Sequence, residues 1–418
     1  MGKYTVNSFF SGIGGFDLAF ERQGFEVKYQ CEINDFCKLI LNRHWPKVPC
    51  DSDITKVQLS DLPTANVWCA GFPCQDVSVA RGSNGRQGLK GKNSGLFYDF
   101  FNLIEKKQPE VILLENVLGL LSSHEGNDFK IILQYLNNAG YGVSWRVFNS
   151  KFFGVPQSRP RVYICAWKND INKAAFVLHE FSESKKNDKA RLQFINPQTN
   201  DEIGFTVPEL AYCLAATSGR HTGTDWSRTY VCYENRVRRL IPTESESLQG
   251  FPLNWTLPND PTENSLYDFD SLRYHAIGNA VSVPVIEWIA KRVKKVLATQ
   301  SENLQIVDVL EKYGDFKKNK PRNQSVKSED HCKIKWNTGG IALAGEAYDC
   351  KVFESCNQSV KSNLIDFISN SYPPEKYFIS AGAARGILRR ADNQNRKLFT
   401  PLRRSLERLS ELDLVQAI

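Results

Sequence analysis

The stretch that decides the fold is YTVNSFFSGIGGFDLAFERQGFEVKYQCE, residues 4 to 32. It reads as a strand from Tyr4 to Phe10, a glycine turn, a helix from about Phe16, and a second strand from Val27 to Cys31. Two strands joined by a crossover helix are the unit from which parallel sheets are built. This stretch therefore predicts that the chain opens with a βαβ unit.

The alternation of strand and helix patterns continues as far as Trp167. We expect further strands at Val67 to Ala70, Val111 to Leu114, Ser144 to Phe148 and Val162 to Trp167, and helices at about Gly95 to Lys107 and Asp128 to Leu136. Such alternation is typical of a mostly parallel sheet with helices on both faces. The predicted fold class is α/β, with a Rossmann-like, doubly wound sheet.

The remaining sequence suggests three further parts beside a first domain at residues 1–167. Residues 168–273 begin with a polar, Lys- and Asn-rich stretch and suit a smaller domain. Residues 274–299 contain a basic, amphipathic pattern from Val283 to Leu297 that predicts a closing helix of the first domain. Residues 300–418 are expected to form a C-terminal extension.

Composition narrows the class of protein. The 418 residues carry 53 Lys and Arg against 46 Asp and Glu, a net charge of +7 that permits a polyanionic partner without requiring one. No apolar run is long enough to cross a membrane, and the N-terminus lacks a signal-peptide pattern, so we expect a cytoplasmic protein. The eleven cysteines include no CxxC pair, which favours free thiols over disulfides or a metal site.

The glycine turn is the first candidate site. Ser11, Gly12, Gly14 and Gly15 lie between a strand and a helix, where glycines let the backbone approach a ligand closely. Glu32 follows twenty residues after Gly12, at the end of the next strand, where an acid can accept hydrogen bonds from ribose hydroxyls. This spacing favours an adenosine-bearing cofactor, although a close-packed turn beside a surface acid stays open as the alternative.

Two more candidates follow strands. Cys74, in GFPCQ, comes after the strand at Val67 to Ala70 and before a basic, glycine-containing loop, where an accessible thiolate could be stabilised. Glu115 closes the apolar run Val111 to Leu114, and a carboxylate there is costly unless it has partners or a function. The other cysteines are expected to be inert residues of the core.

These candidates are expected to meet, because ligands bind beyond the carboxyl ends of the strands in a doubly wound sheet. Gly12, Glu32, Cys74 and Glu115 all stand at such ends in the predicted fold. A thiol nucleophile, an acid and an adenosine site, without the lysine pattern of a phosphate loop, favour covalent group transfer over phosphoryl or hydride transfer.

In these motifs, residues 4 to 297 resemble the DNA methyltransferases that modify cytosine at carbon 5. The matching segments, in the family's order, are FSGIGGFDLAF from Phe10, the acid Glu32, Asp53-Ile54, GFPCQDVS from Gly71, ENV from Glu115, FGVPQSRPRVY from Phe153, RRLIPTESESLQGFP from Arg238 and AIGNAVSVP from Ala276. One departure is Ser247, where the family usually has an arginine. The resemblance implies that S-adenosylmethionine is the cofactor and S-adenosylhomocysteine the product, with no metal.

The resemblance also implies a role for individual residues. Cys74 would be the nucleophile, Glu115 would hold the target base, and Arg161 would assist at the site, with Arg159 as a second catalytic arginine or a phosphate or structural residue. The cofactor would be bound by Phe10, Ser11, Gly12, Gly14, Gly15, Glu32, Ile33, Asp53, Ile54, Gly71, Pro73, Asn279, Ala280 and Val281.

Which segment recognises the DNA sequence stays open between two regions. In the family the recognition domain lies between the motif FGVPQSRPRVY and the motif RRLIPTESESLQGFP, here residues 164–237. The second region is the tail from Asn303. It contains KYFISAGAARGILRRA, which resembles the C-terminal segment of some bacterial and phage members. The basic tail can equally be a solvated helical face. The DNA-contact candidates are Gln75, Ser78, Arg81 and Arg86 in the loop after Cys74, Arg220 and Arg228 in the first region, and Arg389 and Arg390 in the tail.

The function that the resemblance implies is sequence-specific methylation of cytosine in double-stranded DNA, with the target base flipped out of the stack. We expect a monomer, and a restriction endonuclease as the partner of a restriction-modification system. Two alternatives are methylation of RNA cytosine and a catalytically silent DNA-binding regulator.

Overall fold

The computed structural model describes residues 2–72, 96–180, 196–220, 224–258, 269–299, 322–326, 333–356 and 362–415. The chain divides into two compact units. The larger unit comprises Met1–Phe152, Pro160–Lys185 and Val281–Ser359, and the smaller unit comprises Phe153–Arg159, Lys186–Ala280 and Val360–Ile418. The C-terminal extension is therefore shared between the units.

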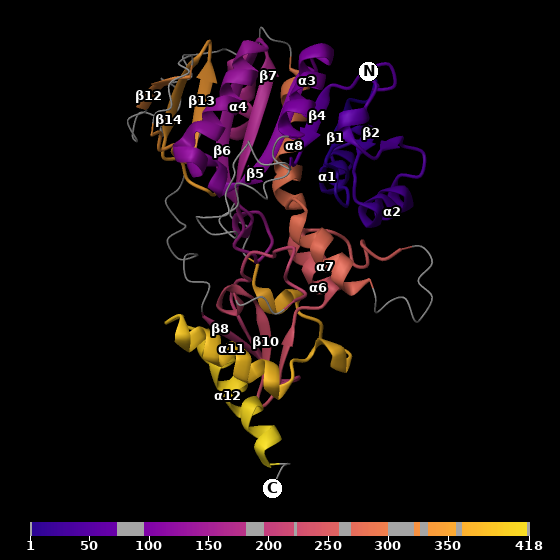
Figure 1. The fold of residues 1–418 in the computed structure, drawn as a ribbon. Coiled ribbons are helices and arrows are strands. Elements are labelled where there is room, and N and C mark those ends of the chain that lie inside the picture. The colour runs from indigo at the N-terminus through magenta and orange to yellow at the C-terminus, as the bar shows by residue number, and fades with distance from the viewer. Residues whose placement is uncertain are drawn as a thin grey trace. The chain divides into compact units, whose positions relative to one another are not determined.

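The described residues of the larger unit form a ten-stranded sheet (Figure 1). In spatial order its strands are β12 (Arg322–Ser325), β14 (Glu346–Cys350), β13 (Gly339–Leu343), β6 (Tyr141–Asn149), β7 (Pro160–Lys168), β5 (Val111–Val117), β4 (Val67–Ala70), β1 (Thr5–Phe9), β2 (Glu26–Cys31) and β3 (Cys50–Asp51). Neighbours from β5 to β3 are parallel, and neighbours from β5 to β12 are antiparallel. The predicted α/β fold with a central parallel sheet is confirmed.

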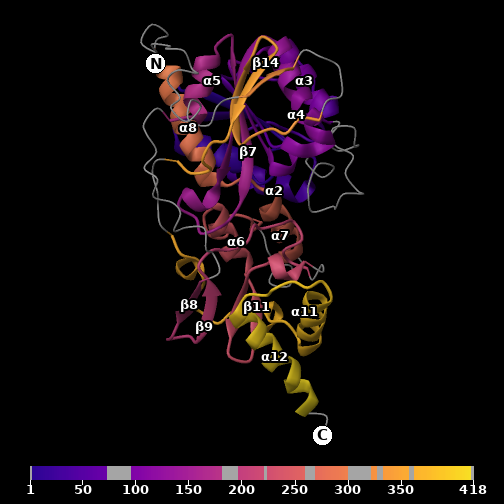
Figure 2. The same cartoon turned by 90° about the vertical axis from the view of Figure 1, so that its left-hand side faces the viewer.

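Helices cover both faces of this sheet, as a doubly wound fold requires. Helices α5 (Ile171–Leu178) and α8 (Val283–Ala298) lie on one face, and α3 (Leu96–Lys107) and α4 (Asn127–Asn138) lie on the other (Figure 2). Helix α1 (Gly15–Arg22) packs against α8, and Arg22 forms an ion pair with Glu287 at 2.6 Å. The predicted closing helix is thus α8, which belongs to the larger unit.

The extension contributes three strands to the edge of the sheet, which the sequence did not predict. Strand β13 pairs with β6, and the Ser144 hydroxyl donates to the Gly340 carbonyl at 3.3 Å. A Cβ at Gly340 would lie 2.3 Å from the ring of Trp145, so glycine is required for this close approach. The Trp336 ring packs edge-on against Trp145, and its Nε1 donates to the Gly126 carbonyl at 2.8 Å.

The smaller unit has its own antiparallel sheet. Its strands, in order, are β11 (Val237–Arg239), β10 (Tyr230–Tyr233), β9 (Phe205–Pro208) and β8 (Pro197–Asn200). Its described helices are α6 (Pro242–Gln249), α7 (Asp270–Asn279), α11 (Ala381–Asn393) and α12 (Thr400–Val415). Helices α11 and α12 pack on one another, and α12 also packs on β10 and β11, so the end of the chain completes this unit.

A buried ion pair anchors the interior of the smaller unit. Arg238 is fully buried and donates to both oxygens of Glu244 at 2.9 Å. Glu244 also accepts from the backbone N–H of Ile241 at 2.8 Å and of Ser369 at 2.9 Å. Bidentate pairing with additional hydrogen bonds is the geometry in which a buried charge pair is tolerated. At the departure from the family pattern, Ser247 donates to the Thr243 carbonyl within α6.

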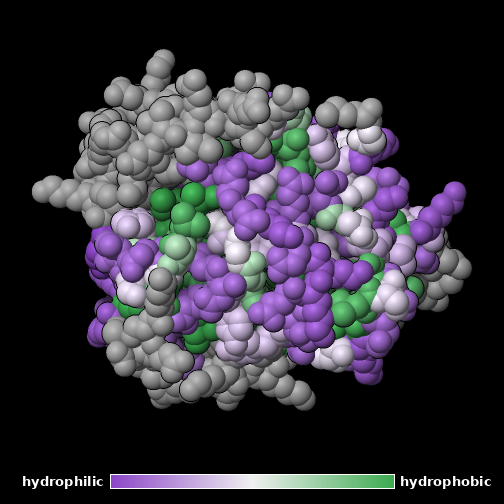
Figure 3. All heavy atoms as spheres, turned by 90° about the horizontal axis from the view of Figure 1, so that it is seen from above, coloured by the Kyte–Doolittle hydropathy of each residue, from purple (hydrophilic) through white to green (hydrophobic). Residues whose placement is uncertain are grey.

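The face of the molecule in Figure 3 is mostly hydrophilic, and its hydrophobic side chains form small, separate groups. Within the part of the chain that the structure describes, no helix combines the length and apolar character that a membrane span requires. The same residues contain no group of three or more His, Cys, Asp or Glu side chains that could hold a metal ion.

Asp17 makes stability depend on pH. It is fully buried in α1, where its Oδ1 accepts from Gln30 Nε2 at 3.0 Å, and burial raises its pKa to about 6. The folded state therefore binds more protons than the unfolded state between about pH 4 and 6, so this group's contribution to stability falls as pH rises through that window. Above pH 6 the cost is roughly 3 kcal/mol.

We expect Asp17→Asn to raise the free energy of unfolding at pH 7.5 by up to about 3 kcal/mol and to leave it nearly unchanged at pH 4. Urea denaturation across this pH range measures the effect. The matched control is Asp35→Asn, whose side chain is 94% exposed. A variant at position 17 with the wild-type pH profile would contradict the assignment.

Candidate active site

The candidate residues gather at one edge of the larger sheet. Strands β1, β2, β4 and β5 are parallel, so their carboxyl ends meet at the same edge. Ser11 and Gly12 follow β1, Glu32 follows β2, Gly71 follows β4, and Glu115 is the third residue from the end of β5. Among the described candidates, this edge brings together the glycine turn and both predicted acids.

The glycine turn is shaped by hydrogen bonds to the next strand. The Ser11 N–H donates to the Cys31 carbonyl at 3.0 Å. Gly14 has a φ of +80°, and a Cβ there would lie 2.3 Å from the Trp45 ring, so only glycine fits. Gly12 has a φ of +56°, and a Cβ there would meet nothing within 4 Å. The backbone at Gly12 is therefore open to close approach by a ligand.

Glu32 is fixed beside that opening. Its Oε2 accepts from the Gly12 N–H at 2.7 Å, and its Oε1 accepts from the Asn34 N–H at 2.8 Å. Burial raises the pKa of this carboxyl, while the backbone hydrogen bonds oppose the rise. Each carboxylate oxygen has a further lone pair, so Glu32 can still accept hydrogen bonds from hydroxyl groups of a ligand. The neighbouring Ile33 is exposed.

Asp53 and Ile54 lie near the end of β3. Asp53 Oδ1 accepts from the N–H of Thr55 at 3.0 Å and from its hydroxyl at 2.8 Å, and these bonds lower the pKa of the carboxyl. Asp53 thereby caps the short 3₁₀ helix Ile54–Lys56, in which Ile54 is buried. The open glycine turn, a buried acid and a capped turn at neighbouring strand ends fit a ligand that carries a ribose and a base.

Glu115 and Arg161 form an ion pair on neighbouring strands. Arg161 Nε lies 3.2 Å from Glu115 Oε1, and the side chains are 14% and 11% exposed. In the antiparallel pairing of β5 with β7, Arg161 stands opposite Val117, two residues beyond Glu115. An acid and a guanidinium held together at a largely buried strand end can exchange hydrogen bonds with a planar polar substrate.

The same edge holds the start of the segment that contains Cys74. The side-chain amide of Asn116 donates to the Phe72 carbonyl at 3.2 Å. A Cβ at Gly71 would lie 3.9 Å from Glu115 Oε2 and 3.7 Å from the Phe16 ring. Sequence reasoning gave Asn116 no role, although its position beside Glu115 was the available signal. Pro73, Cys74, Gln75, Ser78, Arg81 and Arg86 lie outside the described residues.

Several described cysteines have the inert character that the sequence suggested. Burial raises the pKa of Cys31 to about 12 and of Cys50 to about 11, and it raises the pKa of Cys69 and Cys165 further. These thiols stay protonated at neutral pH and are poor nucleophiles.

The segment FGVPQSRPRVY lies partly in each unit, because Phe153–Arg159 belong to the smaller unit and the residues from Pro160 to the larger one. Arg159, in the smaller unit, is 3% exposed and donates to the carbonyls of Leu214 at 2.8 Å and of Ala280 at 2.8 Å. Gln157 is fully buried, donates to the Leu248 carbonyl at 2.9 Å and accepts from the Leu214 N–H at 3.0 Å. Arg159 thus holds backbone segments of the smaller unit together, which favours the structural role among those that the sequence left open. Arg161, two residues later, belongs to the larger unit.

The motif AIGNAVSVP, which begins at Ala276, is divided between the units after Ala280. Asn279, which is exposed, and Ala280 belong to the smaller unit, where Ala280 is held by Arg159. Val281 is buried and begins the return to the larger unit. Gly278 is required here, because a Cβ would lie 2.2 Å from the backbone of Ala215.

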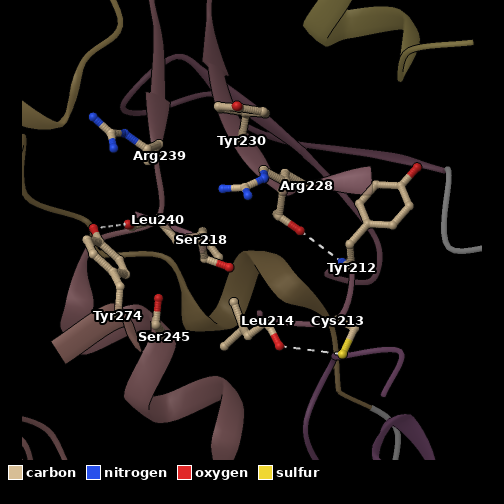
Figure 4. Close-up of a pocket in the computed structure, with 11 residues that line it drawn as sticks. Tyr212, Cys213, Leu214, Ser218, Arg228, Tyr230, Arg239, Leu240, Ser245 and Tyr274 are labelled. Atoms are coloured by element: carbon tan, nitrogen blue, oxygen red, sulfur yellow. Dashed lines mark hydrogen bonds between the residues drawn. The ribbon is translucent and has the colours of Figure 1, made fainter. Parts of the chain in front are cut away.

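Arg228 stabilises a loop of the smaller unit. Its Nη1 donates to the carbonyls of Thr217 at 2.5 Å and Arg220 at 2.6 Å, and burial lowers its pKa. Figure 4 shows the guanidinium directed into a small pocket between the segment at Leu214, strand β11 and helices α6 and α7. The pocket's volume of about 20 Å³ holds about one water molecule. Arg220 itself is exposed.

The two adjacent arginines of α11 differ in their surroundings. Arg390 Nη2 lies 2.9 Å from Oδ2 of the buried Asp225. Arg389 is exposed, and within the described residues it has no hydrogen bond or ion pair.

Comparison with known proteins gives consistent matches over the first 295 residues. The sequence model of the C-5 cytosine-specific DNA methylases matches residues 4–209 and 198–295. Type II methyltransferase M2.BsuMI of Bacillus subtilis (strain 168) is 32% identical over 313 residues, which cover 69% of this chain and 75% of that protein. Type II methyltransferase M.HhaI of Haemophilus parahaemolyticus is 26% identical over 314 residues, which cover 68% and 92%.

Solved structures share the fold. The Entamoeba histolytica methyltransferase EhMeth aligns with a TM-score of 0.52 and 18% identity, over 72% of this chain and all of that chain. The Dnmt2 methyltransferase of S. pombe aligns with a TM-score of 0.52 and 19% identity, over 71% of this chain and all of that one.

Proposed function

Because this chain belongs to the C-5 cytosine-specific DNA methylases, we propose that it methylates cytosine within one short sequence of duplex DNA through a covalent cysteine adduct. The observation that carries the proposal is the Glu115–Arg161 pair, held 3.2 Å apart at the sheet edge where Glu32 meets the Gly12 backbone. An acid for the target base and a site for an adenosine ligand thus share one edge of the sheet.

The residues at Gly12 and Glu32 fit S-adenosylmethionine. Its adenosine part offers ribose hydroxyls to Glu32, and the open backbone at Gly12 allows the close approach that such a ligand needs. When bound, this cofactor supplies an electrophilic methyl group and leaves as S-adenosylhomocysteine. Phe10, Ser11, Ile33, Asp53 and Ile54 complete the proposed binding surface.

Cys74 is the proposed nucleophile. Cytosine carbon 5 is a weak nucleophile, and attack of the Cys74 thiolate on carbon 6 turns the ring into an enamine whose carbon 5 can take the methyl group. Loss of the proton from carbon 5 then expels the thiolate and restores the aromatic ring. The attacked atoms lie inside the duplex stack, so the base must first be flipped out.

Glu115 and Arg161 are proposed to hold the flipped base. Glu115 shares a proton with ring nitrogen 3 and accepts from the exocyclic amino group, which drains electron density from the ring during attack at carbon 6. Arg161, already paired with Glu115, stabilises the developing negative charge. Arg159 is proposed as a structural residue of the smaller unit, where it donates to the carbonyls of Leu214 and Ala280.

The proposed biological role is taken from the names of the relatives. Several of them are named Type II methyltransferases, which supports a protective role beside a restriction endonuclease. We propose that the enzyme acts as a monomer, because each reaction involves one flipped base.

Bisulfite sequencing of DNA from cells that express the chain tests the proposal, with Cys74→Ala as the control. The expected result is conversion-resistant cytosine in one short motif, absent from the control. No protected cytosine from a folded protein that binds S-adenosylmethionine would overturn it. Methylation of transfer RNA or DNA binding without methylation would then support the RNA or the regulator alternative.

The Glu115→Gln variant tests the role of the acid. Glutamine keeps the size of the side chain but cannot share a proton with the base, so we expect kcat/KM to fall roughly 10²- to 10⁴-fold. Methyl transfer to a duplex with the target motif measures the loss, and Glu105→Gln on the exposed side of α3 is the matched control. Wild-type kcat in Glu115→Gln would contradict the role.

A further inference from the structure

Helix α11 lies in the C-terminal extension, outside the residues 4–295 that match the family. Its buried side chains are Ala381, Ala384, Ile387 and Ala391. Its opposite face exposes Arg385, Arg389 and Asn393, which follow one another at intervals of four residues, and Arg385 Nη1 also donates to the Ser410 carbonyl at 3.0 Å. Side chains at this spacing form one stripe along a helix.

The buried face fixes the orientation of this stripe. Ala384, Ile387 and Ala391 belong to the same hydrophobic cluster as Tyr230 and Val237 of the small sheet. Arg390 adds an ion pair with Asp225, which also accepts from the Tyr230 hydroxyl at 3.0 Å. Helix α11 is therefore held on the smaller unit with its polar stripe exposed to solvent.

Two acidic groups near the stripe share one arginine. Asp392 pairs with Arg403 at 2.8 Å, and Glu407 pairs with the same arginine at 2.9 Å. In the parts of the extension that the structure describes, Arg389 and Lys397 have no ion pair, and both are exposed. Arg385, Arg389 and Lys397 outnumber the one acidic charge that Arg403 leaves uncompensated, so this surface has a net positive charge, as an element that approaches DNA phosphates requires.

We propose that the stripe of Arg385, Arg389 and Asn393 recognises the target sequence in the major groove of duplex DNA. This inference rests on the proposed function and names its specificity-determining surface. A helix fits the major groove, where arginine can donate two hydrogen bonds to guanine and asparagine can pair with both polar edge atoms of adenine. Lys397, beyond the end of the helix, contacts the phosphate backbone and adds affinity without sequence preference.

The neighbouring arginines provide a matched pair of variants. Arg389 has a solvent-facing side chain and belongs to the stripe, whereas Arg390 is a positioning residue that acts through Asp225. Removal of either side chain deletes the same charge from adjacent positions of one helix. If the two variants change the sequence preference differently, the cause is therefore the direction of the side chain and not the loss of a charge.

The test uses the full-length chain with the motif that bisulfite sequencing identifies in the wild type. Fluorescence anisotropy measures Kd for a duplex with this motif and for a scrambled duplex, and thermal denaturation measures folding. We expect Arg389→Ala and Asn393→Ala each to reduce the preference for the motif about 10- to 100-fold at unchanged Tm. Arg390→Ala lowers Tm but keeps the preference, and Lys397→Ala weakens both complexes equally.

Wild-type preference in both Arg389→Ala and Asn393→Ala would overturn the inference and make the stripe a solvated helical face. This failure is distinguishable from failure of the proposed function, in which the wild type itself leaves no methylated motif in DNA.

Discussion

Replacement of Cys74 by alanine is expected to abolish methyl transfer while the protein stays folded and binds S-adenosylmethionine. Without the thiolate, carbon 5 of cytosine is not activated, and the remaining residues can only hold the base and the cofactor. Loss of the nucleophile in enzymes with covalent intermediates lowers kcat by roughly 10⁴-fold or more. This is the largest effect that we expect from a single substitution in the chain.

The covalent step itself can be observed with duplex DNA that contains 5-fluorocytosine at the target position. Fluorine at carbon 5 cannot leave as a proton does, so the adduct stays joined to the protein and migrates as a larger species in a denaturing gel. The matched control is Cys69→Ala, because Cys69 is fully buried in β4 with a raised pKa and should not take part. An adduct formed by Cys74→Ala would assign the nucleophile to another residue.

A chain that ends at Thr299 is expected to lose its folded structure, and with it both DNA affinity and specificity. In the cluster that forms the described core of the smaller unit, eight of the eleven buried residues follow position 299: Ile379, Ala384, Ile387, Ala391, Leu398, Leu402, Leu406 and Leu409. Burial of a Leu or Ile side chain contributes about 1.5–3 kcal/mol, so loss of the six Leu and Ile side chains in this set removes roughly 9–18 kcal/mol. This is comparable to the roughly 5–15 kcal/mol by which typical proteins are stable.

The larger unit would lose contacts in the same truncated chain. Trp336 packs against Phe129 and Trp145, and β13 covers the edge of β6. Near-UV circular dichroism and the yield of folded protein measure the effect, and a chain that ends at Val415 is the control. A folded 1–299 chain with wild-type sequence preference would contradict the prediction and assign recognition to residues 164–237.

The parallel half of the fold could be predicted because each of its strands carries its own signal. Val67 to Ala70 is an isolated apolar run, and the strand has these bounds in the structure. Strand β5 extends beyond the expected end at Leu114 to Val117, because Glu115, Asn116 and Val117 pair with β7. That pairing depends on residues more than forty positions later, which no local pattern contains.

Helix α2 (Asp35–His44) and the three strands of the extension were not predicted. The sequence of helix α2 does contain a local helix signal. Asn34 caps the helix by accepting from the Cys37 N–H, and the buried residues recur at helical spacing, at Phe36, Cys37, Ile40 and Leu41. The extension has no comparable signal, because β13 finds its partner in β6, almost two hundred residues earlier.

The residues of the candidate site also differ in whether the sequence could predict their roles. Gly12 and Glu32 were predictable as partners because glycine turns and acids recur at this spacing in βαβ units. Arg389 and Arg390 were indistinguishable in the sequence, since their difference comes from Asp225, 165 residues away. Arg159 and Arg161 stand two positions apart in one motif, but their roles diverge because the chain passes from one unit to the other between them.

The pairing of β13 with β6 also affects how the protein is made. A ribosome that adds roughly 5–20 residues per second needs about 10 to 40 s to proceed from β6 to β13. Throughout that interval the nascent chain carries a nine-residue strand with one unpaired edge. Such an edge is a template for pairing with other chains. Until β13 has been made, this edge of β6 can therefore pair with other chains, and synthesis of the last quarter of the chain ends that exposure.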